Sequence, residues 1–369
     1  MAALAARAAT EELAAFTIGF DIRRYDERVA ARSTVDWIAA NNAHGLTHYE
    51  QVVDFRSFPV LEQLAAHYGE PFADFSMLPE YFLSRFAATQ VKVALSGDGA
   101  DEIFAGYERY LAMRCFEYLD WTPDFLKQWG VRLLQYFPDG GKRSRIGRSK
   151  RLLKVAAAPL ERRYFELMAQ ATEIERRGLY GERMTAAGLS DSARILQRLA
   201  RSAGSLSKIE RCQEVDLGSY LCGDILVKID RAAMANSLEV RSPFLDTAVV
   251  EFAARLPLSF KQSGRSRKHI VKAAFAGLVP PGVLEGRKRG FAVPLGSWFR
   301  REWRDLLRER LLEGRLVRDG WMKRDALAVR IEEHASGRND RTELLGALLM
   351  LELFLEQEAP GAGGPEKTA

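Results

Sequence analysis

The sequence predicts an α/β protein with a Rossmann-like parallel sheet, followed by a helical C-terminal part. Helical patterns alternate with β-rich runs over residues 1–113, an apolar run leads into a glycine-rich turn at residues 91–99, and the β signal fades after Leu111. Such alternation is typical of a parallel sheet with crossover helices. We therefore expect an α/β part at 1–113, a mostly helical part at 114–356 and a disordered tail at 357–369.

The individual elements follow from their patterns. The β-rich runs that we expect to be strands are Phe16–Phe20, Leu46–Val53 and Val91–Ser96. Helical spacing of apolar residues predicts helices near 26–42, 57–67 and 76–89. The first residues, MAALAARAATEELAAF, have Arg7 within their apolar stretch, which indicates an amphipathic helix and not a signal peptide.

Composition places the chain among ordinary globular proteins. Of its 369 residues, 47% are hydrophobic and 28% are charged, and we find no apolar run long enough to span a membrane. The three cysteines, Cys115, Cys212 and Cys222, are scattered, so we expect neither a zinc site nor a disulfide framework, and a cytoplasmic location. The basic cluster Lys142–Lys154 has no aromatic residues for base stacking, so we interpret it as a solvated surface and expect no nucleic-acid partner.

The segment Val91–Tyr107, VKVALSGDGADEIFAGY, is the most informative. Glycines at the end of a strand allow a ligand to approach the backbone, and a following helix N-terminus favours anions. Three carboxylates, Asp98, Asp101 and Glu102, face this expected phosphate site, which predicts a cation such as Mg²⁺ between them. The alternative is a plain strand-to-helix turn in which the acids favour the helix dipole.

Two further segments concentrate charge. Residues 224–246, DILVKIDRAAMANSLEVRSPFLD, follow helical spacing until Ser242 and Pro243 end the pattern, and their charges include Glu239 and Arg241. A solvated helix face is the simpler interpretation, whereas a ligand site would explain ions in an apolar setting. Residues 286–298, GRKRGFAVPLGSW, place three cations in a loop that would suit phosphate or would simply be exposed. Lys268, at an expected helix start, is another phosphate candidate.

Together these segments resemble the ATP-dependent synthetase domain of the glutamine-hydrolysing asparagine synthetases, over nearly the whole chain. The matching segments, in the family's order, are FTIGF with Asp26 and Glu27, EPFADFSMLP, SGDGADEIFAGY, DILVKIDRAAMANSLEVRSPFLD, RKRGFAVPLGSW and LLGALLMLELFL. The resemblance implies a sheet of the adenine nucleotide alpha hydrolase type. It also implies two steps, in which an aspartate carboxylate forms an acyl-adenylate with MgATP and ammonia then displaces AMP.

The resemblance also implies roles for particular residues. It implies nucleotide contacts for Ile18, at the adenine, and for Ser96 and Gly97. We expect Gly99 and Lys268 to bind the nucleotide as well. It implies that Asp98 takes part in forming the adenylate and that Lys288 holds pyrophosphate during catalysis.

The remaining roles concern the metal and the second substrate. The resemblance implies that Asp101 binds Mg²⁺, with Glu102 as a neighbour that orients the metal or the loop. It implies that Glu239 and Arg241 shape the aspartate pocket. The expected ligands are ATP, Mg²⁺, aspartate or a related carboxylate, and ammonia. The family commonly dimerises, so a homodimer is one candidate assembly, and the sequence leaves the oligomeric state open.

The sequence departs from the family in two places. It has no glutaminase domain, so we expect no glutamine hydrolysis by this chain, and the family's Ser-Gly-Gly-x-Asp-Ser loop with the strand before it would lie upstream of Met1. We expect a start placed too late or a gene fragment, with a degenerate homologue as the second explanation. The alternatives in function are a relative that forms another amide, such as a lactam synthetase or a peptide cyclase, and a non-catalytic remnant.

Overall fold

The computed structural model describes residues 1–22, 25–41, 45–119, 121–136, 152–153, 155–156, 158, 160–188, 191–202, 206–264, 266–286 and 293–358. The chain forms two compact units that are interleaved along the sequence. Unit 1 contains Met1–Asp54, Phe75–Cys115 and Arg198–Pro294, and unit 2 contains Phe55–Asp74, Phe116–Gln197 and Leu295–Ala369. The sequence analysis predicted one boundary near residue 113. In the structure, each compact unit is assembled from separate stretches of the chain.

Unit 1 holds the parallel strands. Strand β1 (Leu13–Phe20) pairs in parallel with β2 (Leu46–Val53), and β3 (Val93–Leu95) pairs in parallel with β4 (Glu239–Arg241). The three predicted strands are therefore confirmed, and with them the α/β class. The helical interpretation of residues 224–246 was wrong at its end, because α14 (Leu226–Met234) stops before β4 begins.

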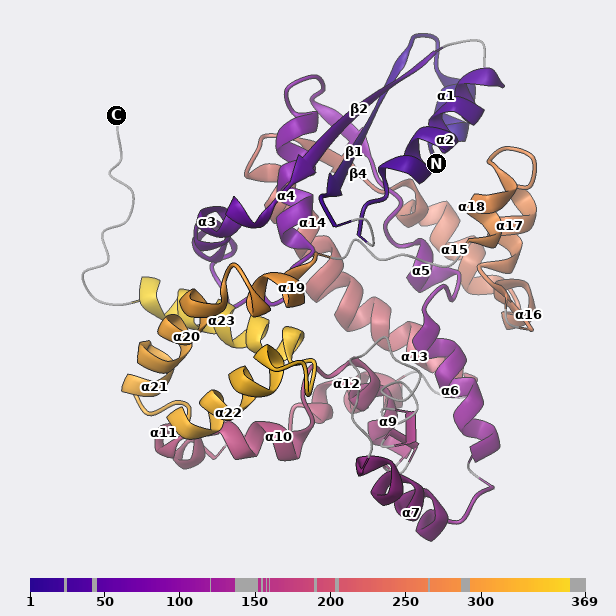
Figure 1. Cartoon of the computed structure of the whole chain (residues 1–369). Helices are drawn as coiled ribbons and strands as arrows, with labels where there is room; N and C mark the ends of the chain where they lie inside the picture. Colours follow the sequence, from indigo (N-terminus) through magenta and orange to yellow (C-terminus); the bar gives the residue numbers. More distant parts are fainter. Residues whose placement is uncertain are drawn as a thin grey trace. The chain divides into compact units, whose positions relative to one another are not determined.

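Helices cover both faces of the β1–β2 pair (Figure 1). Leu13 and Ala15 pack with buried residues of α1 (Ala2–Ala8) and α2 (Arg28–Ala40). Phe16 points to the opposite face and packs with α4 (Met77–Ala87), where its ring lies 5.6 Å from that of Phe86. This alternation is the period of two that a strand imposes on its side chains. Ala94 and Val240 join the same cluster, so α4 and α14 form one helical layer under both strand pairs.

The rest of unit 1 is mainly helical. Its elements are α5 (Ala100–Ile103), α6 (Glu108–Leu119), α12 (Ala193–Ser202), α13 (Lys208–Asp216), the π-helix η2 (Leu217–Ile225), η3 (Pro243–Leu245), α15 (Thr247–Arg255), α16 (Leu258–Lys261), β5 (Gln262–Ser263), β6 (Ser266–Arg267), α17 (His269–Ala274) and α18 (Pro281–Glu285). Both α6 and α12 cross a boundary between the units. The β signal does not end at Leu111, because the short strands β4, β5 and β6 follow it.

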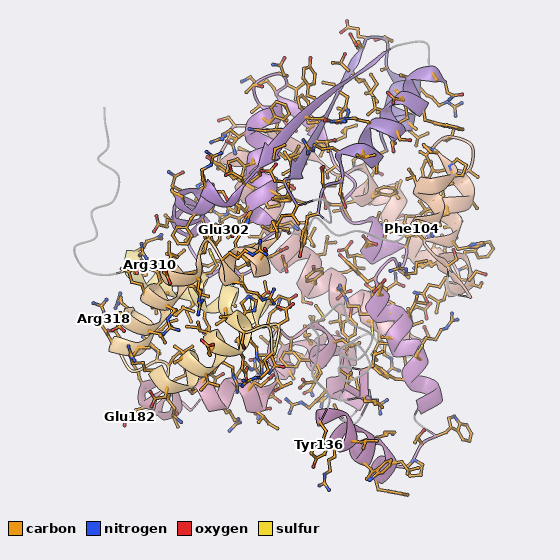
Figure 2. All side chains as sticks on the ribbon, in the orientation of Figure 1. Phe104, Tyr136, Glu182, Glu302, Arg310 and Arg318 are labelled. Atoms are coloured by element: carbon orange, nitrogen blue, oxygen red, sulfur yellow. The ribbon has the colours of Figure 1, made fainter. Side chains whose placement is uncertain are left out.

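Unit 2 is helical. Its elements are η1 (Phe55–Ser57), α3 (Phe58–Tyr68), α7 (Asp124–Gln135), α9 (Leu160–Met168), α10 (Glu173–Leu179), α11 (Glu182–Ala186), α19 (Leu295–Arg300), α20 (Arg304–Glu313), α21 (Arg315–Arg318), α22 (Arg324–Ala335) and α23 (Thr342–Gln357). Arg310, labelled in Figure 2, links α3 to α23 through ion pairs with Glu62 (2.8 Å) and Glu356 (2.6 Å). Among the residues that the structure places, none of the helices combines the length and apolarity needed to cross a bilayer.

Candidate functional site

The candidate site lies in unit 1, where β3 and β4 end side by side. The backbone N–H of Ser96 donates to the carbonyl of Arg241 (2.9 Å), and the hydroxyl oxygens of Ser96 and Ser242 lie 2.9 Å apart. The loops that leave the two strands are thus tied together at their first residues. In parallel α/β sheets, ligands bind in the crevice beyond these carboxyl ends.

The turn after β3 has the glycines that its shape requires. Gly99 has a φ of +84°, and a Cβ placed there would lie 2.1 Å from Cδ2 of Leu245. A side chain at Gly97 would meet nothing within 4 Å. Gly99 is therefore a structural requirement of the turn, while Gly97 leaves open space beside the backbone, as a bound ligand would need. Asp98 lies between them and is half-buried.

Asp101 points toward a lysine from a distant part of unit 1. Its Oδ1 lies 3.1 Å from Nζ of Lys268, the residue that precedes α17. The predicted helix start at Lys268 is confirmed, and its contact with Asp101 was not foreseen because 167 positions separate the two residues. The pair brings a cation and a carboxylate to one side of the turn.

Glu102 is turned into the interior, where it is 1% exposed. Its Oε1 accepts a hydrogen bond from the Tyr107 hydroxyl (2.6 Å), and its carbonyl accepts one from Nε2 of Gln213 (2.6 Å). Burial raises the pKa of Glu102, and the hydrogen bond from Tyr107 opposes that shift. Burial also raises the pKa of Tyr107.

The expectation that all three carboxylates face one cation was wrong. The described part of the chain contains no group of three histidine, cysteine, aspartate or glutamate side chains that could hold a metal ion. The physical reason is the short helix α5, which directs Asp101 to Lys268 and Glu102 into the core. In sequence the two acids are adjacent, but around a helix neighbouring residues point about 100° apart.

A single carboxylate still suits Mg²⁺ that arrives with a nucleotide. In proteins this ion is usually held by one or two carboxylates together with substrate phosphates, and not by a dedicated protein cage. Asp101 is 21% exposed, whereas Glu102 is 1% exposed, so of the two acids of α5 only Asp101 is open to such an ion.

A buried network contacts Tyr107, the hydrogen-bond partner of Glu102. Asp216, at the end of α13, is fully buried, lies 2.7 Å from Nη2 of Arg109 and accepts a hydrogen bond from the Tyr110 hydroxyl. The guanidinium carbon of Arg109 lies 3.7 Å from the centre of the Tyr107 ring. No local sequence pattern marks this network, because 107 positions separate Asp216 from Arg109.

Glu239 and Arg241 lie on the outer face of β4. Their side chains form an ion pair at 2.7 Å and are 56% and 63% exposed. The register pairs them with Val93 and Leu95 of β3, which are also exposed. The two charged residues of the predicted substrate pocket therefore lie on a strand face and not on a helix face.

Two further predicted residues have different outcomes. Ile18 lies in β1 and is 3% exposed, so its side chain belongs to the core. Lys288 lies outside the described residues.

An apolar pocket of about 340 Å³ lies in the same unit, next to α5. Phe104, labelled in Figure 2, forms part of its wall. Its other lining residues include Leu4, Phe244, Phe252, Ile270 and Phe275. Because its lining is nearly all apolar, it does not offer the charged partners that an amino-acid substrate needs.

Comparison with known proteins gives a consistent result. A family model described as asparagine synthase matches residues 1–356. Asparagine synthetase (glutamine-hydrolyzing) 1 of Bacillus subtilis is 29% identical over 93% of this chain and 52% of its own length. Putative asparagine synthetases (glutamine-hydrolyzing) of Mycobacterium bovis and Mycobacterium tuberculosis are each 34% identical over 96% of this chain and 52% of their own. The chain thus spans about half the length of the curated relatives it matches.

Proposed function

The chain belongs to the asparagine synthase family, and on that premise we propose that it is the synthetase part of an ATP-dependent amide ligase. The observation that carries the proposal is the joined end of β3 and β4, where Ser96 and Ser242 meet beside the open turn at Gly97. The family match covers this turn and both strands. We extend the proposal to a sheet of the adenine nucleotide alpha hydrolase type.

The proposed reaction has two steps. An oxygen of the aspartate side-chain carboxylate forms a bond to the α-phosphorus of ATP, and the bond from that phosphorus to the β-phosphate oxygen breaks and releases pyrophosphate. The nitrogen of ammonia then bonds to the acyl carbon, AMP leaves with the oxygen, and the nitrogen loses a proton. Mg²⁺ bound with the nucleotide would neutralise the charge that develops on the phosphates.

The residues of the turn divide the work. Ser96, Gly97 and Gly99 would place the nucleotide with backbone groups, because the turn leaves its backbone open at Gly97. Asp98 would lie at the reacting carboxylate, and Asp101 would hold the metal. Glu102 acts through other groups, since its side chain is buried, and is a positioning residue for the turn.

The remaining assignments rest mainly on the family match and less on contacts in the structure. Lys288 would bind the leaving pyrophosphate, Lys268 would meet a phosphate, and the exposed pair Glu239 and Arg241 would bind the charged groups of aspartate. In the relatives' names the reaction includes glutamine hydrolysis, and for this chain we propose ammonia as the direct nitrogen donor, with a glutaminase domain as the partner that supplies it.

The test is isotope exchange between pyrophosphate and ATP, because this exchange reports adenylation without the amide-forming step. We expect exchange that requires both aspartate and Mg²⁺. Asp98→Asn should reduce it by about a hundredfold, a loss typical of removing one group that acts in the transition state. Glu251→Gln, which neutralises an exposed acid of α15, is the matched control and should leave the exchange unchanged.

Other carboxylates belong in the same assay. Exchange that another amino acid supports, while aspartate does not, would identify a relative with a different acceptor. Absence of exchange with every carboxylate, in this chain and in a protein extended by any in-frame sequence upstream of Met1, would replace the ligase with a non-catalytic remnant.

A further inference from the structure

The segment Gln262–Lys268 holds the turn that follows Asp101. Gln262, which is 3% exposed, donates from Nε2 to the carbonyl of Ala105 (3.2 Å). Arg267 donates from Nη1 to the carbonyl of Gly106 (3.2 Å). Together with the 3.1 Å contact between Lys268 and Asp101, these bonds tie β5, β6 and the residue after β6 to α5 and to the turn that follows it. Lys268 is thus placed at Asp101 by the surrounding structure.

The contact is close-packed and depends on a glycine. A Cβ at Gly106 would lie 1.9 Å from Oδ1 of Asp101 and 2.4 Å from Cε of Lys268, so the pair rests directly on bare backbone. Lys268 has a φ of +50°, in the left-handed region that residues other than glycine rarely adopt. Its place at the carboxylate is therefore imposed by the fold against the local preference of the backbone.

We propose that Lys268 competes with Mg²⁺ for the Asp101 carboxylate. Its ammonium neutralises this carboxylate while no metal is bound and moves away from it when Mg²⁺ binds. This inference rests on the proposed function in its assignment of Asp101 to Mg²⁺. A Mg²⁺–oxygen bond is about 2.0–2.1 Å long, and the ammonium lies only 3.1 Å from the same carboxylate oxygen. Two cations that close repel each other strongly where water is partly excluded. The lysine side chain is 28% exposed and flexible, so it can leave.

The competition couples metal and phosphate. Mg²⁺ alone must displace the ammonium from Asp101 and brings no anion that could replace this carboxylate. Mg²⁺ that arrives on a polyphosphate brings anionic oxygens that the displaced ammonium can bind. Lys268 would therefore make the two ligands bind cooperatively, and by linkage each would strengthen the other.

The test is a calorimetric titration of the full chain with Mg²⁺ alone, without nucleotide. We expect Lys268→Met to bind Mg²⁺ at least about fivefold more tightly than the unmodified chain, the lower end of typical coupling factors. Lys272→Met removes the other lysine of α17 and is the control for a general loss of positive charge. It should change the affinity little, and Asp101→Asn should abolish the tight binding of the Lys268→Met protein when the two are combined.

A purely structural role gives a different pattern. Lys268→Met would then lower the midpoint of thermal unfolding without tightening Mg²⁺ binding, and that result would overturn the proposal, as would equal affinities for Lys268→Met and Lys272→Met. Lys268→Asn is the second variant, because asparagine is neutral and tolerates the left-handed region. The readout needs no catalysis, so a chain that shows the competition but no pyrophosphate exchange would retain this inference and lose only the proposed function.

Discussion

The hydroxyl oxygens of Ser96 and Ser242 lie 2.9 Å apart, although 146 positions separate the two residues in the sequence. Each serine is the first residue after its strand, so the bond joins the two loops that frame the candidate site. The parallel register of β3 and β4 brings them together, because parallel strands end at the same edge of a sheet.

Removing this bond should weaken the fold of unit 1. We expect Ser242→Ala to lower the free energy of unfolding by about 1 kcal/mol, the usual net worth of a hydrogen bond in a folded protein. Urea denaturation followed by circular dichroism measures it. Ser263→Ala, at an exposed position of β5, is the control and should lie within about 0.5 kcal/mol of the unmodified chain. Equal stabilities for the two variants would show that the contact contributes nothing.

The two glycines of the turn should respond differently to alanine. Gly99→Ala meets both the left-handed backbone and Leu245, so we expect it to destabilise the protein by about 2 kcal/mol or more. Gly97→Ala meets open space and should cost less than about 1 kcal/mol. Urea titrations of the two variants provide the comparison. If Gly99→Ala were as stable as Gly97→Ala, the described turn would be wrong.

Glu102 should make unit 1 less stable as the pH rises. Burial raises its pKa in the folded state above the ordinary value of 4.5, so the folded form holds a proton that the unfolded form has lost. Its contribution is therefore fully present below pH 4.5 and is lost as the pH rises through the folded pKa. Glu102→Gln should flatten this part of the stability profile, as measured by urea unfolding between pH 4 and pH 8. An unchanged slope would contradict the assignment.

His334 should give unit 2 the opposite dependence. Burial and the nearby Arg300 lower its pKa below 6.5, and the ring is held neutral between the carbonyl of Gly296 (3.1 Å) and the N–H of Arg341 (3.1 Å). The unfolded form then binds the extra proton, so stability is present above pH 6.5 and falls as the pH is lowered through that value. His334→Gln should remove this loss. A melt followed by tryptophan fluorescence can measure it, because five of the six tryptophans, Trp298 and Trp303 among them, belong to unit 2.

Lys288 should matter for chemistry and not for folding. We expect Lys288→Ala to lower pyrophosphate exchange by about a hundredfold or more, because the proposed role is to stabilise charge on the leaving phosphates. Its circular dichroism spectrum and unfolding midpoint should match those of the unmodified chain. Lys272→Ala is the control for the loss of one positive charge. Lys261→Ala would not serve, because Lys261 is buried. Normal exchange in Lys288→Ala would remove Lys288 from the mechanism.

Several features could be predicted from the sequence because their causes are local. The β-rich run Leu46–Val53 predicted a strand with the same bounds as β2, and helical spacing located α2, α3 and α4 to within a few residues. The glycine-rich turn after β3 was also visible, because glycines at the end of a strand indicate a turn, and Gly99 has the left-handed backbone that glycine adopts readily. The order of the family's segments along the chain identified the family without any structure.

What the tertiary structure decided are the pairings between distant segments. A three-residue strand such as Glu239–Arg241 has too few residues for a period to appear, and it exists because β3 supplies its hydrogen bonds. In the same way, sequence placed Asp98, Asp101 and Glu102 in one cluster, while the fold gave Asp101 to Lys268 and buried Glu102 against Tyr107 and Gln213. The residue types of the site can be identified from short stretches of sequence. The contacts that each charged side chain makes depend on the packing of segments that are distant in the sequence, and no local pattern contains this information.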